Sequence, residues 1–304
     1  MVIRVVKIGI LIGGLVVTTA EAYESTLTFG AGSRSETFDW SIGFGDTTPN
    51  ILSELSWDKL EIREATIEYS KLVDEWFYLK AQARHGWIQD GRVQDSDYFG
   101  DGRTDEFSRS VSATDKGYTE DLSFGMGIPF QVEDIDIAPQ ITIIPMVGFS
   151  QNTQSYRIRK GQQIYPTTGT IPGLNSLYEA EWKGLWLGVD FFIRTGRRVS
   201  LFAQLERHNA KYNADANWNL RPEFAHPISF SHTADDAEGT VVALGYIYNF
   251  SQSFGYSVRI ENQTWKSGKG VDTVFFADGS SQSTQLNNAN WSNRRFELSL
   301  MYHF

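Results

Sequence analysis

Apolar and polar residues alternate along much of the chain. Near the C-terminal end, one side of the alternation carries Phe296, Leu298, Leu300, Tyr302 and Phe304. The same alternation recurs near residues 122–130, 135–149, 185–191, 199–205, 242–250 and 254–260. Because successive side chains of a strand point to opposite sides, this pattern predicts β-strands with one apolar face.

Two architectures bury alternating strands, a soluble sandwich and a membrane barrel. The opposite faces of these strands carry glycine and polar residues, and strands that are apolar outside and polar inside are typical of transmembrane barrels. Aromatic residues make up 14% of the chain although its mean hydropathy is −0.32, which suits one apolar and one wet surface. We expect an all-β fold, a ten-stranded antiparallel transmembrane β-barrel of the outer-membrane type with long extracellular loops.

The alternation predicts ten strands joined by links of unequal length. The strands lie near residues 25–38, 53–69, 75–92, 118–130, 135–158, 178–194, 198–214, 233–250, 254–268 and 290–304. Short links are predicted at 70–74, 131–134, 195–197 and 251–253, and long ones centre on 40–52, 93–117, 160–177, 215–232 and 269–289. Barrels place short turns in the periplasm and long loops outside, so we expect the long links at the cell surface.

The N-terminal segment has the pattern of a secretory signal peptide. Two basic residues precede an uncharged run, and the sequence AEA at 20–22 forms a small-x-small cleavage site. The run is shorter than the roughly 20 residues that a spanning helix needs. We therefore expect a signal peptide over residues 1–22 and a single barrel domain over residues 23–304.

Composition and net charge limit the kinds of site and partner that the protein can have. The chain has no cysteine, which excludes disulfides, a thiol nucleophile and cysteine-ligated metals. Its net charge of −10 argues against nucleic acid as a partner and favours basic peptides or proteins. The sequence makes no prediction for the oligomeric state.

The stretch VQDSDYFGDGRTDE carries two aspartates, Asp95 and Asp97, two residues apart. Together with Gly100 and Glu106 they occupy positions 1, 3, 6 and 12 of a calcium-loop pattern. Position 5 is Phe99, which cannot bind a cation. We therefore predict no metal site in this stretch.

Four short motifs, in order along the chain, resemble the omptins, a family of outer-membrane endoproteases. LSWDK at 55–59 resembles the family's entry into its second strand, and DSDY at 95–98 resembles its paired-aspartate motif. YRIRKG at 156–161 is similar to its basic third-loop segment, and WKSGKG at 265–270 to the exit of its ninth strand. The resemblance covers nearly the whole chain after the predicted signal peptide.

The resemblance implies a cleft in which an Asp-Asp pair and an Asp-x-His pair activate water for attack on a peptide bond. Asp95 and Asp97 match the first pair. Asp215 matches the aspartate of the second pair, but Asn217 stands where the family has histidine. Asparagine cannot accept a proton from water, so the usual base is missing. His226 and His232 flank the same loop and are the candidates for a replacement base.

Strand parity bears on this site. Asp95 and Asp97 share odd numbering with the apolar residue Leu79, and Asp215 shares it with Leu205. Without an intervening bulge, these carboxylates are expected to point out of the barrel.

The resemblance also implies that Arg157 and Arg159 hold lipopolysaccharide phosphates, since arginine makes bidentate contacts with phosphate. The expected partners are then outer-membrane lipid and lipopolysaccharide, the latter as activator, and no cofactor is expected. Three functions stay open at this point. They are a surface endopeptidase cleaving near basic residues, an inactive barrel acting as adhesin, receptor or structural protein, and a narrow porin, which inward aromatic side chains would obstruct.

Overall fold

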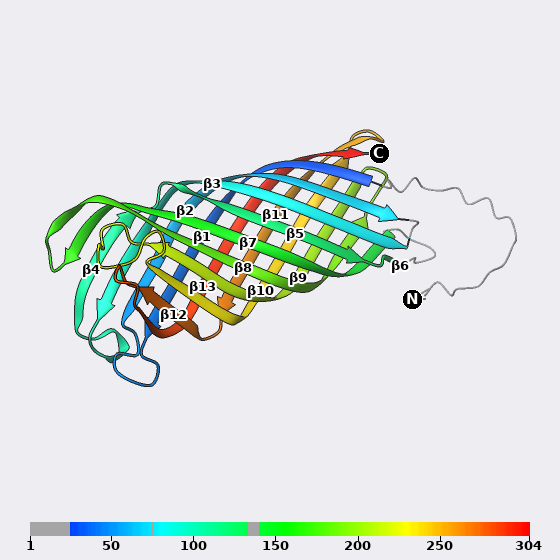
Figure 1. The fold of residues 1–304 in the computed structure, drawn as a ribbon. Helices are drawn as coiled ribbons and strands as arrows, with labels where there is room; N and C mark the ends of the chain where they lie inside the picture. The colour runs from blue at the N-terminus through cyan, green and yellow to red at the C-terminus, as the bar shows by residue number, and fades with distance from the viewer. Residues whose placement is uncertain (1–24, 74–75, 133–139) are drawn as a thin grey trace, which may run out of the picture.

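The computed structural model describes residues 25–73, 76–132 and 140–304, so the predicted signal peptide lies outside the described residues. The described residues form thirteen β-strands and one short 3₁₀ turn, η1 (Asp101–Arg103) (Figure 1). The strands are β1 (Ser25–Gly43), β2 (Ser53–Val73), β3 (Phe77–Tyr98), β4 (Glu106–Ala113), β5 (Gly117–Gly127), β6 (Phe130–Val132), β7 (Gln140–Tyr165), β8 (Gly169–Arg194), β9 (Val199–Asn217), β10 (Phe230–Asn249), β11 (Phe254–Ser267), β12 (Gly270–Phe275) and β13 (Ser281–His303).

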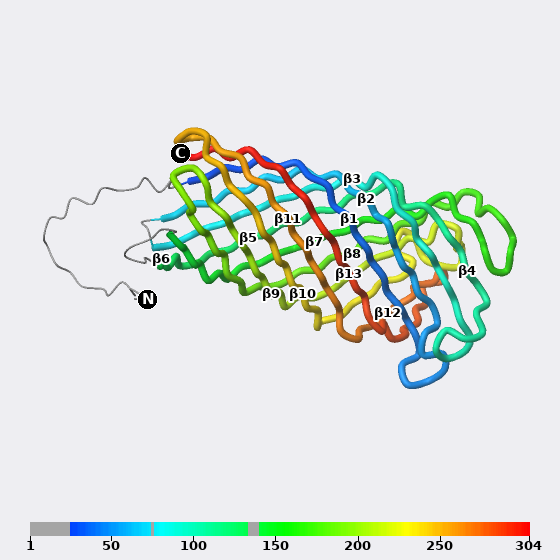
Figure 2. Tube along the Cα trace, turned by 180° about the vertical axis from the view of Figure 1, so that it is seen from behind, coloured from blue at the N-terminus to red at the C-terminus, as the bar shows by residue number. Residues whose placement is uncertain are grey.

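The strands form one closed antiparallel ring. β4, β5 and β6 follow one another along β7, and β11 and β12 both lie between β10 and β13, so the described ring has ten strand positions. β1 pairs with β13 from Thr26 opposite His303 to Gly43 opposite Gln285, which closes the ring (Figure 2). The predicted fold class, a ten-stranded antiparallel barrel, is confirmed.

The apolar side of the alternation faces outward. On β8, Leu185 and Leu187 are 64% and 67% exposed, whereas Trp182 and Trp186 on the other face are buried. A continuous exposed apolar wall of this kind belongs in lipid, where every backbone polar group must be paired within the protein. No helical segment among the described residues has the length and apolar character that a membrane span requires.

The strands are longer than the sequence pattern predicts. β7 and β8 have 26 residues each, and most of the predicted loop at 160–177 belongs to their hairpin. Much of the predicted loop at 93–117 lies in β3, β4 and the start of β5, so Asp95 and Asp97 lie on a strand, not on a loop. The extensions lie at the end of the barrel away from the C terminus (Figure 1). Their outward faces meet water, so apolar alternation stops there although strand pairing continues.

Aromatic side chains fill the inside of the barrel. This aromatic plug consists of Phe38, Trp40, Trp57, Tyr156, Tyr178, Trp182, Tyr212, Trp265 and Trp291, each 3% exposed or less. Its rings are in contact, with centroids 4.5 Å apart for Trp182 and Tyr212 and 5.1 Å apart for Trp57 and Tyr156. A ten-stranded barrel is narrow enough for side chains to fill, and here they do.

A buried ion lattice lies against the plug. It consists of Arg34, Arg84, Arg295, Glu64, Asp121 and Glu261. One Arg34 amino group lies 3.2 Å from Glu64 and 3.1 Å from Asp121, and the guanidinium carbon lies 5.0 Å from the ring centroid of Trp291. Buried charges are costly unless each is paired, so these arginines and acids depend on one another.

The plug is expected to contribute strongly to stability. Trp182→Ala should lower the free energy of unfolding by about 3–5 kcal/mol, because it leaves a cavity among closely packed rings. Trp87→Ala is the matched control, since Trp87 is 49% exposed on the outer wall, and it should cost no more than about 1 kcal/mol. Urea unfolding in detergent micelles measures both. Equal losses would mean that the plug does not hold the barrel together.

Candidate functional site

A bulge aims the first aspartate pair into the barrel. The register between β2 and β3 shifts on both sides of Glu61, and Lys59 nearby has a φ of 53°. Before the shift the buried residue on β3 is the even-numbered Ile88, and after it the odd-numbered Val93. Asp95 follows Val93 on the same face, so the bulge reverses the parity that would have pointed it outward.

The surroundings of the pair are polar but partly buried. Asp95 lies between Leu55 and Ser110 in register, and Asp97 lies between Ser53 and Ser108. Ser108 and Ser53 hydrogen-bond the Asp97 carboxylate. Gln163 donates to the Ser108 hydroxyl at 3.1 Å. The pair thus lies between serine residues of the two neighbouring strands, β2 and β4.

Burial raises the pKa of both carboxyls. On β3 the large apolar residues of the outer wall end at Trp87, so both aspartates lie beyond the lipid-facing wall. Burial raises the pKa of Asp95 to about 8, and the charge of Asp97 adds to the rise. Burial also raises the pKa of Asp97, while the hydrogen bonds from its two serines and the charge of Arg221 oppose that rise. Near neutral pH Asp95 can therefore hold a proton and act as a proton donor.

Asp215, which belongs to the second half of the predicted site, points away from the barrel interior. The pairing of β9 with β8 has no register shift, and the shift in its pairing with β10 places the extra residue on β10. β9 therefore keeps its alternation, and Asp215 is exposed and faces outward opposite Glu179. Burial and the charge of Glu179 raise the pKa of Asp215. The inward positions beside it are held by Ala214 and Ala216, which are buried in the core. The structure therefore does not bring Asp215 together with Asp95 and Asp97.

Asn217 and the two histidines are also dispersed. Asn217 ends β9, and its side-chain oxygen lies 3.0 Å from Nδ1 of His226, which belongs to the following loop. His232 lies on the inner face of β10 and is fully buried, with Nδ1 2.9 Å from the Tyr178 hydroxyl. The residue opposite Asp215 is Ser231, so His232 does not lean over Asp215 as the sequence suggested.

His232 has a partner that sequence reasoning missed. Its Nε2 lies 3.2 Å from Oδ1 of Asp272, and Thr284 donates to the other oxygen of that carboxylate at 2.7 Å. Asp272 falls within the predicted loop at 269–289, where no periodicity placed it. The structure shows it on β12, next to β10. The pair is closed to substrate, because both side chains are 1% exposed or less.

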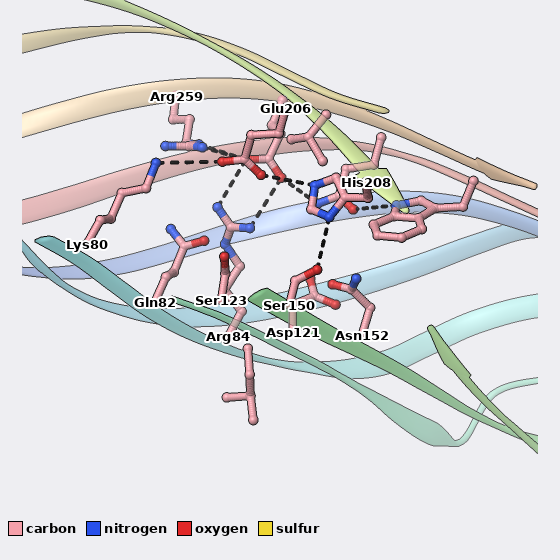
Figure 3. A pocket seen from close by; sticks show the side chains of 15 residues that line it. Lys80, Gln82, Arg84, Asp121, Ser123, Ser150, Asn152, Glu206, His208 and Arg259 are labelled. Atoms are coloured by element: carbon pink, nitrogen blue, oxygen red, sulfur yellow. Dashed lines mark hydrogen bonds and ion pairs between the residues drawn. The ribbon is translucent and has the colours of Figure 1, made fainter. Parts of the chain in front are cut away.

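A third histidine lines a small cavity of about 30 Å³ (Figure 3). Ser150 Oγ lies 3.0 Å from Nδ1 of His208, and Nε2 lies 3.2 Å from Glu206. This is the order of a nucleophile, a base and an acid, but the cavity has room for water and not for a peptide. A peptide substrate therefore has no access to these residues.

The predicted lipopolysaccharide residues are partly paired. Arg157 donates to the side chain of Asn175 at 3.3 Å, and Arg159 lies 3.4 Å from Asp115, which Lys160 also contacts. Among the described residues, no three histidine, aspartate or glutamate side chains gather as metal ligands.

The comparisons with known proteins agree on an outer-membrane barrel. The sequence profile of the family described as "Pom: Protochlamydia outer membrane protein" matches residues 28–304. No protein with a curated description matches the chain in sequence. The structure is similar to the outer membrane protease OmpT from Escherichia coli, with a TM-score of 0.73 and 14% identity over 92% of this chain and 96% of that one.

Weaker matches are the outer membrane protein OprG from Pseudomonas aeruginosa and Ail, the attachment invasion locus protein of Yersinia pestis. Their TM-scores are 0.35 and 0.27, their identities 7% and 8%, and they cover 93% and 92% of this chain and 98% and 99% of their own. The likeness to OmpT shows the fold alone, and the protein is located in the outer membrane, as predicted.

The raised pKa of Asp95 predicts that the stability of the protein depends on pH. Its pKa is about 8 in the folded state against 3.8 ordinarily, so the folded state holds a proton that the unfolded chain releases. The contribution of this proton to the free energy of unfolding is therefore complete below about pH 4, and it is lost as the pH rises through about 8. Asp95→Asn, which imitates the protonated form, should avoid roughly 1–3 kcal/mol of that loss between pH 5 and pH 9.

Urea midpoints of the two proteins at a series of pH values measure this difference. Asp46→Asn, at an exposed turn position, is the control and should keep the pH dependence of the parent. A parent protein whose midpoint does not fall more steeply than that of Asp95→Asn would contradict the burial of a protonated Asp95.

Proposed function

Because the chain belongs to the Protochlamydia outer membrane protein family and has the fold of OmpT, we propose that it is a closed surface barrel that binds ligands at its extracellular end and does not cleave peptides by the omptin mechanism. The observation that carries the proposal is the orientation of Asp215. Its carboxylate faces outward, and alanines occupy the inner positions where a water-activating pair would have to face Asp95.

The interior supports a binding role over transport. The aromatic plug and the ion lattice fill the barrel, so a ligand meets the molecule at its ends and outer wall. The extracellular end carries long paired extensions, above all the hairpin of β7 and β8, whose exposed residues include Ile164 and Tyr165. The net charge of −10 favours basic peptides or proteins as ligands, in the manner of a receptor or adhesin.

A second candidate function is that of a surface endopeptidase. It is favoured by one observation, the inward orientation of Asp95 and Asp97 with the raised pKa of Asp95. In this case the aspartate pair would have to activate water without a histidine. Lipopolysaccharide, held near Arg157 and Arg159, would be the expected activator.

A labelled peptide with a dibasic pair, added to refolded protein with lipopolysaccharide, separates the two functions. Fluorescence anisotropy should show binding that weakens as salt rises from 50 to 500 mM, because screening reduces contacts between exposed charges. A fluorogenic version of the peptide should show no turnover. Asn217→His should stay equally silent, because the neighbouring Asp215 carboxylate faces outward and cannot form the inward pair.

The matched variant is Asp97→Ala. Turnover in the parent that Asp97→Ala lowers by about 10²–10⁴-fold would establish the endopeptidase instead, since that is the range for loss of a general base. Activity that appears only in Asn217→His would mean that the outer strands rearrange on substrate binding. Either result would overturn the proposed function.

The filled interior also predicts that the barrel does not conduct ions. In a planar bilayer the refolded protein should show no steady conductance steps, whereas a sixteen-stranded porin in the same membrane should show them. Steady ohmic steps from the parent protein would favour the porin reading and would require the plug to move.

A further inference from the structure

The outer wall has a hollow that the alternation of large apolar residues would not create. It is centred on Ala81 and Ala83 of β3, with Tyr69 and Ile67 on one side and Phe124 and Leu122 on the other. The hollow has a volume of about 480 Å³. Because strands are about 4.8 Å apart, the flanking backbones are separated by about 9–10 Å, and the gap above the two short alanines has the width of one hydrocarbon chain.

The lining suits an apolar occupant. Ile67 and Phe124 are 44% and 45% exposed, and they stand on the lipid-facing wall of the barrel. The residues around the hollow are apolar apart from Gln82, Ser123 and Gln151. An unfilled hollow would leave its lining without van der Waals partners on one side, so a flexible chain that follows its shape is favoured there.

A cation stands at the rim of the hollow. Leu122, Gln151 and Lys183 lie side by side in register on β5, β7 and β8. The Lys183 ammonium is 6.0 Å from the ring centroid of Phe149, which also lines the hollow. Lys183 is exposed, and no carboxylate in the described part of the chain lies within salt-bridge distance of it.

The neighbouring cations differ from Lys183. On the adjacent strand β9, Lys211 is 2.7 Å from Asp235, and Arg207 contacts Glu238. Glu181, two residues before Lys183 on β8, accepts a hydrogen bond from Gln151 at 2.6 Å. The outer wall thus combines, at one place, a hollow for a single chain and a cation that lacks an anionic partner.

We propose that this hollow binds one acyl chain of a phospholipid whose phosphate pairs with Lys183. The hollow opens into the bilayer, so a lipid chain is the occupant that reaches it without crossing water. A lysine ammonium on a flexible stem is a suitable partner for a phosphate at the edge of the apolar layer. The site lies on the lipid-facing wall and is independent of the extracellular binding proposed above.

Native mass spectrometry of the purified barrel tests the proposal, with phosphatidylethanolamine, a diacylglycerol of the same chains and lipid A as probes. The parent protein should retain one phosphatidylethanolamine molecule. Ala83→Phe, which fills the hollow, should lower retention of phosphatidylethanolamine and diacylglycerol about tenfold. Lys183→Gln should lower retention of phosphatidylethanolamine about tenfold and leave diacylglycerol unchanged, because only the phosphate is lost as a partner.

Matched controls are Ala203→Phe and Lys266→Gln, which change the same residue types on the outward faces of β9 and β11, away from the hollow. Both should retain lipid like the parent, and heat-modifiable gel mobility confirms that every variant is folded. Equal losses in variants and controls would overturn the site. Preferential retention of lipid A, or a dimer that Ala83→Phe dissociates, would assign the hollow to a different occupant and overturn the proposal.

Discussion

Pairing of the backbone across lipid is the constraint on which the rest of this structure depends. Each N–H and C=O group that crosses the bilayer must be bonded within the protein, and a sheet meets that demand only if it has no free edge. The long β1–β13 pairing, from Thr26 to Gly43, removes the edge. Closure with ten strand positions then sets the diameter, and the diameter is small enough for aromatic rings and ion pairs to fill the interior.

Filling the interior with both rings and charges has consequences for rigidity. Arg34 and Arg295 each contact Glu64 and Asp121, which come from different strands of the ring. Removing one member would leave the others buried without compensation, so the lattice ties distant strands to a single arrangement. The neighbouring plug is apolar and strengthens these contacts, since electrostatic attraction grows as the surroundings become less polar. A barrel held in this way leaves its ends and its outer wall as the surfaces that a ligand can reach.

The sequence was most informative where the period of alternation coincided with lipid on the outside. Phe296 to Phe304 could be assigned to a strand because one face had to be apolar throughout. Beyond the lipid both faces of the strands are polar or mixed, so the alternation does not predict the strand extensions. It predicts a loop at Asp95, which lies on β3. Asp272 shows the same limit, because its partner His232 is forty residues away in sequence and only the β10–β12 register brings them together.

The alternation of strand faces explains why the outward orientation of Asp215 could be predicted from the sequence and the inward orientation of Asp95 could not. The odd numbering of Asp95 and of Asp215 predicted the same outward orientation for both, and only a bulge could distinguish them. The shift near Glu61 turns Asp95 inward, whereas β9 pairs with β8 without a shift and leaves Asp215 outside. Short motifs match a family by residue type, whereas a catalytic site also requires side chains on one face. A barrel with the fold of OmpT can therefore carry a pair of aspartates that resembles the omptin motif and still present the pair to a different set of neighbours.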